Sequence, residues 1–245
     1  MIKFFRTIRQ NLIIENKTSR YVTYAIGEII LVVIGILIAL QINNWNSSRI
    51  DNKRVDAFVE KLKIQTQNNI DKTEDYIANF DSYFKISQEL VYIIGEKTIE
   101  DIDPKIDSLV NVNYHDYHLN LDTNIITEGR ENGDLALLSS DKLRQALYNL
   151  ITENIALTER ERITNEDLNL LFVPYLNRNM NLRNRTPIST IGKSKLYKND
   201  NYKILDDQEF ENYIISRMEY NKDNLEVYKK MKYLLESIYK LIETH

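Results

Sequence analysis

An unbroken apolar run near the amino terminus constrains this chain more than any other feature. The 21 residues from Val22 to Ile42 read VTYAIGEIILVVIGILIALQI, and the stretch from Ile29 to Leu40 contains no polar residue. A helix rises about 1.5 Å per residue, so this segment matches the roughly 30 Å hydrocarbon core of a bilayer. The run therefore predicts a helix that crosses a membrane, and it is less typical of a buried core helix in a soluble protein.

Aromatic residues flank the run on both sides. Tyr21 and Tyr24 precede the twelve apolar residues from Ile29 to Leu40, and Trp45 follows them, which is the pattern of side chains that anchor a span at the two membrane interfaces. The run is too long for the apolar region of a secretory signal, and its exit, IALQINNWN, lacks a small-residue cleavage site. We therefore expect residues 21–46 to remain as a transmembrane anchor.

The charge distribution predicts the orientation of this anchor. Residues 1–46 carry five basic and two acidic residues, a net charge of 5 − 2 = +3, whereas the rest carries 27 basic and 34 acidic residues, a net of −7. The positive-inside rule then places the amino terminus in the cytoplasm and, in a Gram-negative cell, residues 47–245 in the periplasm. An acidic domain offers no face for a nucleic-acid backbone, so nucleic acid is not an expected partner.

Residues 1–20 form a basic leader with an amphipathic pattern. Phe4 and Phe5 share one helical face with other apolar residues, while Lys3 and Arg6 lie opposite. This pattern predicts a short helix in the inner-leaflet interface, with Phe4 and Phe5 as additional anchors and the basic face toward anionic headgroups. The alternative is a frayed leader that serves topology alone.

Two blocks of sequence resemble a known family. The segment YAIGEIILVVIGILIALQINNWN at residues 24–46, preceded by IKFFRTIRQNLIIENKTSRY at residues 2–21, resembles the start of an uncharacterised family of bacterial single-pass membrane proteins. A weaker match is GDLALLSSDKLRQALYNL at residues 133–150, where Leu138 and Ser139 occupy the positions at which the family usually has Ile followed by Ser or Asn. The resemblance implies one span followed by a helical extracytoplasmic domain. It implies no activity, because the family has none established.

One stripe of the span carries the residues that go beyond anchoring. At about 100° per residue, one side of the helix collects six residues: Tyr21, Glu28, Gly35, Ala39, Ile42 and Asn46. Gly35 and Ala39 form a small-xxx-small pair that lets another helix approach closely. We therefore expect Glu28, Gly35, Ala39 and Ile42 to pack against a second helix.

Glu28 has two further interpretations. It lies about one turn beyond Tyr24, so its carboxylate can extend toward the cytoplasmic headgroups and be merely tolerated. Alternatively, a short leader, one span with an acid and a large periplasmic domain resemble the layout of ion-coupled stator proteins of bacterial motors. In that case Glu28 would bind and release protons, although it lies nearer the cytoplasmic end than the midplane.

Composition and periodicity predict an all-α extracytoplasmic bundle of long antiparallel helices. Six Gly and three Pro in 245 residues are too few for many short strands, and none lies between Gly35 and Gly95. Apolar residues spaced by sevens after the span predict a long helix that continues directly from the membrane. The residues on this expected seam are Val55, Val59, Leu62, Tyr76, Phe80, Tyr83, Leu90 and Ile94, interrupted by Thr66, Asn69, Thr73 and Ser87.

Two more long helices have start signals. Ser139 or Ser140 can cap a helix, and Asp206 begins a second one with an acidic first turn. The inward residues expected in the first are Leu143, Ala146, Leu147, Leu150, Ile151 and Ile155, with Leu168 and Leu171 continuing toward Pro174. Those in the second are Phe210, Tyr213, Ile214, Leu225, Tyr228, Met231, Leu235, Ile238 and Ile242. Shorter helices are expected at 122–139 and 168–182, with loops at 97–121 and 183–204.

Few residues suggest chemistry. His115, Asp116 and His118 place two imidazoles and a carboxylate within four residues, yet no third ligand is identifiable, so a polar loop is favoured over a metal site. Gly192-Lys193-Ser194 resembles the end of a phosphate-binding loop, but Pro187 occupies the position that requires glycine. A basic, amide-rich patch is typical of a solvated helix end; it comprises Asn177, Arg178, Asn179, Arg183, Asn184 and Arg185.

The sequence therefore predicts a non-catalytic module without a cofactor or a metal. Its expected partners are the lipid bilayer and either a second copy or another inner-membrane protein, reached through the span and the bundle. One alternative is a periplasmic ligand-sensing domain that signals through a partner, and another is the ion-coupled subunit that uses Glu28. An enzyme would require a polar pocket that converges on His115, Asp116 and His118.

Overall fold

The structure is a computed structural model, and it describes residues 18–96, 103–185, 192, 194, 196 and 201–244. Helices account for nearly all regular structure in these ranges, and no described residue lies in a strand. The expected all-α class is confirmed. The chain divides into two compact units, Met1–Ala57 and Phe58–His245, so the expected domain boundary at residue 46 stays a prediction. Phe4, Phe5 and the rest of the leader to residue 17 lie outside the described residues.

The first long helix, α2, spans Thr18–Ile93. It contains no proline, and its sequence after Gly35 is free of glycine, so nothing interrupts its hydrogen-bond ladder. It ends where Gly95 adopts a φ of 80°, a left-handed conformation that only glycine takes at low cost. The amide of Gly95 then donates to the carbonyl of Leu205 at 3.0 Å. The expected continuous helix through the apolar run is therefore present.

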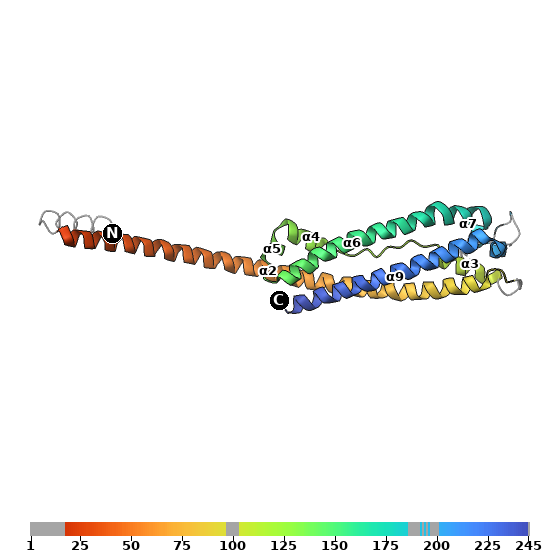
Figure 1. The fold of residues 1–245 in the computed structure, drawn as a ribbon, viewed down its shortest axis with the longest axis horizontal. Coiled ribbons are helices and arrows are strands. Elements are labelled where there is room, and N and C mark those ends of the chain that lie inside the picture. The colour runs from red at the N-terminus through yellow and green to blue at the C-terminus, as the bar shows by residue number, and fades with distance from the viewer. Residues whose placement is uncertain are drawn as a thin grey trace. The chain divides into compact units, whose positions relative to one another are not determined.

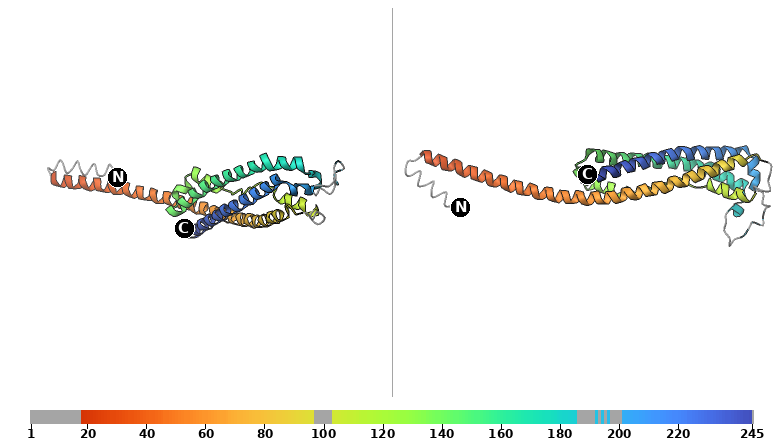
Figure 2. Two further views of the ribbon diagram at one scale, coloured as in Figure 1. Left: turned by 45° about the vertical axis from the view of Figure 1, so that its right-hand side comes forward. Right: turned by 90° about the horizontal axis from the view of Figure 1, so that it is seen from below.

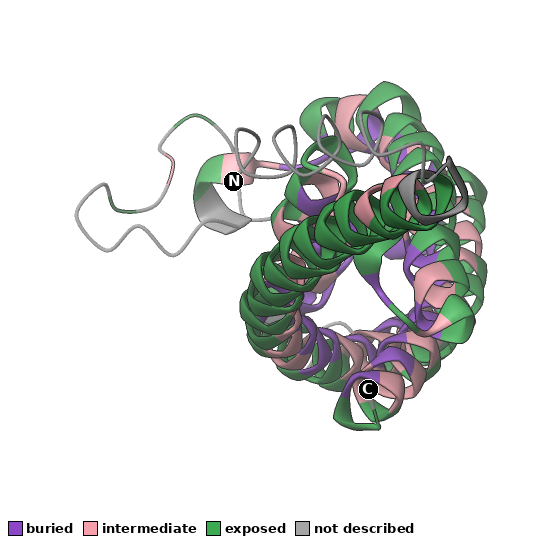
Figure 3. Ribbon diagram, turned by 90° about the vertical axis from the view of Figure 1, so that its left-hand side faces the viewer, coloured by how far each residue is buried: buried purple, intermediate pink, exposed green. Residues whose placement is uncertain are grey.

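The first unit contains the candidate membrane span. From Val22 onward α2 is long and apolar enough to cross a bilayer, with a mean hydropathy of 2.6 over its most apolar window and none of that window buried. Figure 3 shows the part of α2 in this unit as almost entirely exposed. Apolar side chains without protein cover are stable in lipid and costly in water, so a membrane anchor is consistent with this unit.

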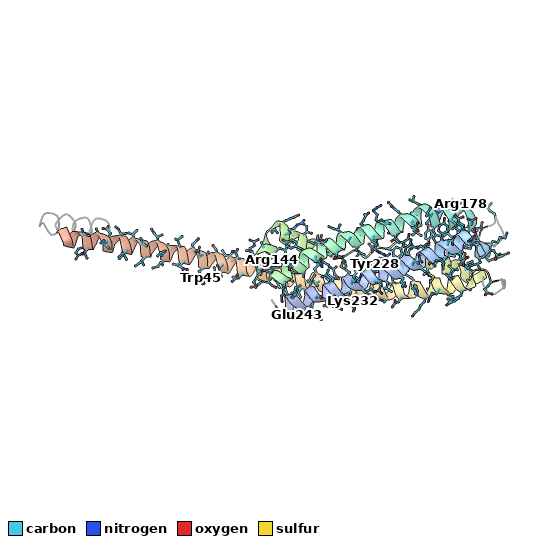
Figure 4. The ribbon with its side chains drawn as sticks, in the orientation of Figure 1. Trp45, Arg144, Arg178, Tyr228, Lys232 and Glu243 are labelled. Atoms are coloured by element: carbon cyan, nitrogen blue, oxygen red, sulfur yellow. The ribbon has the colours of Figure 1, made fainter. Side chains whose placement is uncertain are left out.

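The second unit is a bundle of three long helices. The part of α2 after Phe58 lies beside α6 (Asp141–Asp167) and α9 (Gln208–Glu243), as Figures 1 and 2 show from three directions. Lys232 on α9 pairs with Glu74 on α2 at 2.5 Å, and Glu243 pairs with Lys63 at 3.3 Å. Rising numbers on α9 thus meet falling numbers on α2, which makes this pair antiparallel (Figure 4 labels Lys232 and Glu243).

Both expected helix starts are capped by side chains. The Ser140 hydroxyl accepts from the Leu143 amide at 3.2 Å at the beginning of α6. Asp207 accepts from the Glu209 amide at 2.8 Å at the beginning of α9, and Glu209 and Glu211 occupy its first turn. A cap of this kind satisfies an otherwise unpaired amide and stabilises a helix by about 1 kcal/mol.

The seam of α2 is more polar than periodicity alone suggests. Leu62, Phe80 and Leu90 are buried as expected, and Tyr76 and Tyr83 are half-buried. The four polar residues that interrupt the seam are buried too: Thr66, Asn69, Thr73 and Ser87. These residues therefore continue the inward face rather than break it.

Two residues that we expected in the core, on the helix that begins after Ser140 and its continuation, lie at the surface, so these two predictions are wrong. Ile155 is 65% exposed and Leu171 is 48% exposed. The inward face of α6 instead includes Leu150, Leu157, Glu161 and Thr164. Because Glu161 and Thr164 are polar, the apolar heptad pattern does not identify this face.

A short stretch of π-helix, called the π-turn below, moves Leu171 out of the core. Residues Leu168–Phe172 form η1, a stretch of π-helix, before α7 (Val173–Asn179). Pro174 cannot donate to a carbonyl in the preceding turn, and its ring would crowd an α-helical carbonyl four residues earlier, so the helix widens there. The extra residue rotates Phe172 into the core in place of Leu171.

Several expected loop residues are helical. Residues Asp103–Val112 form α3, which contradicts the loop expected at 97–121, because Ile106, Leu109 and Val110 bury an apolar face. In the second expected loop, α8 (Leu182–Arg185) and the 3-10 helix η2 (Asn201–Asp206) are regular. The short helices expected within 122–139 are α4 (Asn124–Glu131) and α5 (Asp134–Leu137).

Candidate functional site

A non-helical segment, residues 113–123, lies within the helical bundle. Its buried and exposed residues alternate, with Tyr117, Leu119 and Leu121 buried and Asp116, His118 and others exposed. This period of two is that of an extended chain. Extended backbone inside a bundle has no neighbouring strand, so its amides and carbonyls need other partners.

Asparagine side chains supply two of these partners. Asn165 on α6 accepts from the Tyr117 amide at 2.8 Å and donates to the Tyr117 carbonyl at 3.0 Å. Asn69 on α2 accepts from the Asp122 amide at 2.9 Å and donates to the Asp122 carbonyl at 2.7 Å. A side-chain amide carries the same donor and acceptor as a peptide, so each asparagine takes the place of a paired strand.

Charged side chains complete the cradle of the segment. Glu161, which is 4% exposed, accepts from the Leu119 amide and from the Tyr228 hydroxyl, both at 2.9 Å. Lys72 donates to the Asn120 carbonyl at 2.5 Å, and the Tyr76 hydroxyl accepts from the His118 amide. Side chains of α2 and α6 thus bind the segment directly, and α9 supports it through the bond from Tyr228 to Glu161 (Figure 4 labels Tyr228 midway along α9).

Aromatic rings surround the same layer. The ring of Phe80 lies 5.0 Å from those of Tyr76 and Tyr228 and 5.3 Å from that of Tyr117, centroid to centroid. Burial raises the pKa of Tyr76 and of Tyr117 to about 12, and it raises that of Tyr228 further. These phenols are therefore neutral hydrogen-bond partners at neutral pH rather than bases.

Arg217 on α9 is the buried cation of this layer, and it is 2% exposed. Its Nη2 donates to the His115 carbonyl at 2.9 Å, and its guanidinium carbon lies 4.5 Å from the centre of the Tyr117 ring. Its Nε and Nη1 have no hydrogen-bond partner among the described residues. Burial lowers the pKa of Arg217 because the charged form is desolvated.

The two histidines do not form a shared site. The ring of His115 is half-buried, 4.0 Å from that of Tyr83, whereas His118 is exposed. Successive side chains of an extended chain point to opposite sides, so two residues three positions apart face away from each other. Among the described residues, no group of three His, Cys, Asp or Glu could hold a metal ion. The backbone of residues 115–118 forms hydrogen bonds with side chains of the bundle helices, a role that sequence patterns did not predict.

His115 should make the bundle sensitive to acid. Burial and, secondarily, Arg217 lower the pKa of the His115 imidazole to about 4, below its ordinary value of 6.5. The unfolded chain therefore binds this proton more readily, and the free energy of unfolding should fall as pH drops from 6.5 toward 4. Urea unfolding of the wild type and of His115→Gln across this range tests the effect. Parallel pH profiles for the two proteins would contradict it.

A surface hollow of about 500 Å³ lies beside α6, but its charges are already paired. It is lined by His118, Arg162, Glu166 and Asn169 among others. Arg162 binds Glu159 at 2.8 Å and also pairs with Glu166. Such exposed pairs contribute little to stability, and the hollow presents no nucleophile beside a base.

The residues expected in the span lie on one exposed helix. Tyr24 and Trp45 flank the apolar run, and the Arg49 guanidinium lies 5.8 Å from the Trp45 ring centre. A Cβ atom added at Gly35 would have no atom of a neighbouring element within 4 Å. Ala39 and Ile42 are exposed one and two turns further along, Glu28 is half-exposed, and the side chain of Tyr21 is not described.

The basic patch and the Gly192 stretch, for which the sequence did not favour a binding role, have only local contacts. Arg178 is exposed on α7, and Arg183 donates to the Gly192 carbonyl at 2.9 Å. Gly192 has a φ of 67° and Lys193 lies outside the described residues. These contacts give the patch a local structural role.

Comparison with known protein families shows the family to which the chain belongs. A model of a family of unknown function, DUF6090, matches residues 28–169, which is more than half of the chain. The chain belongs to the DUF6090 family. No curated protein and no solved structure matches the chain significantly. The part shared with DUF6090 runs from Glu28 in the span to Asn169 in the π-turn, so it includes the extended segment and both of its asparagine partners. Helix α9 lies outside the match.

Proposed function

We propose that this DUF6090 protein is a non-catalytic, membrane-anchored helical module that associates through its span. The span lies in the inner membrane of a Gram-negative cell with its amino terminus in the cytoplasm, and the bundle is periplasmic. The basic residues before the span and the acidic composition after it support this orientation. The partner that we expect first is a second copy of the chain.

The open face at Gly35 and Ala39 carries this proposal. Lipid tails are as apolar as leucine, so helices associate in a membrane chiefly where small residues let their backbones come close. The space around Gly35 is empty to 4 Å from the point where a Cβ atom would lie, and Ala39 is exposed one turn later. This face is available to another helix.

The use of polar groups in the bundle supports a non-catalytic role. Glu161, Asn165, Asn69 and Tyr76 each bind the backbone of the extended segment. Groups committed to backbone amides hold a fold together and are not positioned to exchange protons with a substrate. The exposed charges on α6 are likewise paired with each other.

Gly35→Leu should weaken association by about tenfold or more, since a loss of about 1.4 kcal/mol is a factor of ten. A leucine side chain would hold two backbones apart and remove their close contact. Resonance energy transfer between donor- and acceptor-labelled full-length chains, diluted with lipid in vesicles, measures the association constant. An unchanged constant for Gly35→Leu would disprove the proposed contact.

Leu37→Phe is the matched control. Residue 37 lies about 200° round the helix from residue 35, so it adds bulk at similar depth on the opposite face. Its association should equal that of the wild type. Glu28→Gln should also associate normally under this proposal, whereas an ion-coupled role would require that this variant assemble but lose function.

Native mass spectrometry of the protein purified from its own membranes identifies the partner. A homo-oligomer supports association between copies of the chain. A stoichiometric second membrane protein would instead make the chain an accessory subunit, and Gly35→Leu should then release that protein.

A further inference from the structure

The most anomalous group in the bundle is the guanidinium of Arg217. A buried cation without a counter-ion is costly, because water that would solvate it is absent. Arg217 has one hydrogen bond to a carbonyl and one aromatic face, while its Nε and Nη1 have no partner among the described residues. Asp116 and Asp167 act on it only through their field, without a hydrogen bond. A missing anionic partner would account for this arrangement.

Two irregularities of the backbone lie at the same level of the bundle. The extended segment passes over Arg217 at His115 and continues to Tyr117, which Asn165 binds. Only three residues after Asn165, the helix widens into the π-turn η1. A π-turn forgoes regular α-helical bonds and commonly occurs at functional sites. A buried charge, a π-turn and a non-helical segment thus converge.

We propose that Arg217 binds a small monocarboxylate inside the bundle. One buried cation balances one negative charge, whereas a phosphate dianion would leave an excess negative charge near Asp116 and Asp167, whose charges already act on the guanidinium. The unpartnered nitrogens are closed to solvent, so a ligand must displace part of the cover over Arg217, and acetate, as a very small carboxylate, requires little displacement. Nε and Nη1 donate to the carboxylate oxygens as charge-assisted hydrogen bonds.

Entry requires the cover over Arg217 to open. This cover is the beginning of the extended segment, including His115, and it is held by side chains rather than by a helical or sheet ladder. Segments of this kind open locally at lower free energy than the helices around them. Once the ligand is bound, the segment would close over it again, and the ligand would balance the charge of Arg217.

The first test measures binding to the wild-type full-length chain in detergent. Titration of ¹³C-labelled acetate, followed by its NMR signal at constant ionic strength, should show saturable binding of one acetate per chain. Sodium chloride and sodium phosphate at the same ionic strength should compete at least tenfold less well. Non-saturable binding, or equal competition by chloride, would overturn the carboxylate site.

The second test measures thermal unfolding by circular dichroism. At an acetate concentration one hundred times its Kd, the wild-type Tm should rise by about 5 °C or more. Arg217→Met keeps the length of the side chain but removes the charge, and its Tm should not respond to acetate. Arg160→Met is the control, since Arg160 is partly exposed, binds Asp223 and Asn224 about two turns of α9 from Arg217, and should not affect the response.

An acetate response that survives Arg217→Met would overturn the inference, as would its absence in the wild type. In either case buried water or a rearranged Asp116 or Asp167 satisfies the guanidinium. The inference is independent of association through the span, so its failure leaves the Gly35 contact standing. Its success would favour a ligand-sensing role for the bundle.

Discussion

Glu161→Leu should destabilise the bundle by about 2 to 5 kcal/mol, because a buried donor without an acceptor costs about 1–3 kcal/mol. The substitution deprives two donors of their acceptor, the Leu119 amide and the Tyr228 hydroxyl. Both are buried, so water does not replace the lost oxygen. Urea unfolding of the full-length protein in detergent measures the change. Hydrogen exchange at residues 113–123 should accelerate in parallel, since the segment loses one of its attachments.

Glu161→Gln separates hydrogen bonding from charge. Glutamine keeps an acceptor oxygen and removes the carboxylate charge, so this variant should lose less than about 1.5 kcal/mol if acceptance of hydrogen bonds is the main role. If Leu and Gln variants were equally stable, the attachment of Leu119 through Glu161 would carry no appreciable free energy.

Phe80→Ala should cost about 3–5 kcal/mol, the usual effect of emptying the site of a buried aromatic ring. Phe80 is 2% exposed and its ring contacts those of Tyr76, Tyr83, Tyr117 and Tyr228. Three parts of the unit meet at this ring: α2, α9 and the extended segment. Chemical denaturation gives the magnitude, and the loss of near-ultraviolet circular dichroism from the tyrosines reports the local disorder.

Ile155→Ala provides the control for Phe80→Ala. Ile155 is a large apolar residue on α6 whose side chain is 65% exposed, so its truncation should change stability by less than about 0.5 kcal/mol. A loss at Ile155 comparable with that at Phe80 would mean that the exposed face of α6 is covered by a partner in solution.

Helix starts and most apolar core positions could be predicted because they depend on local chemistry. Ser140 and Asp207 cap their helices through oxygens within three residues. On α9, the apolar residues from Tyr228 to Ile242 repeat at spacings of three and four and are buried accordingly. Periodicity was less informative wherever the inward residue is polar, as at Arg217, Asn221 and Asn224.

The cradle of the extended segment could not be predicted in the same way. Asn69 is 53 residues from Asp122, and Asn165 is 48 residues from Tyr117, so no local pattern pairs them. An asparagine on a helix seam suggests a weakened core until its distant partner is known. A histidine-rich stretch likewise suggests ligands, although its backbone is what the bundle uses.

The sequence by itself determined the apolar run, the all-α class and the starts of α6 and α9, because hydrophobicity, backbone freedom and capping act within a few residues. Only the tertiary structure decided that residues 113–123 lie inside the bundle, that the π-turn brings Phe172 inward, and that Arg217 is buried with two nitrogens lacking a hydrogen-bond partner among the described residues. These features depend on which distant groups satisfy one another's hydrogen bonds and charges, and that choice is made only when the helices pack.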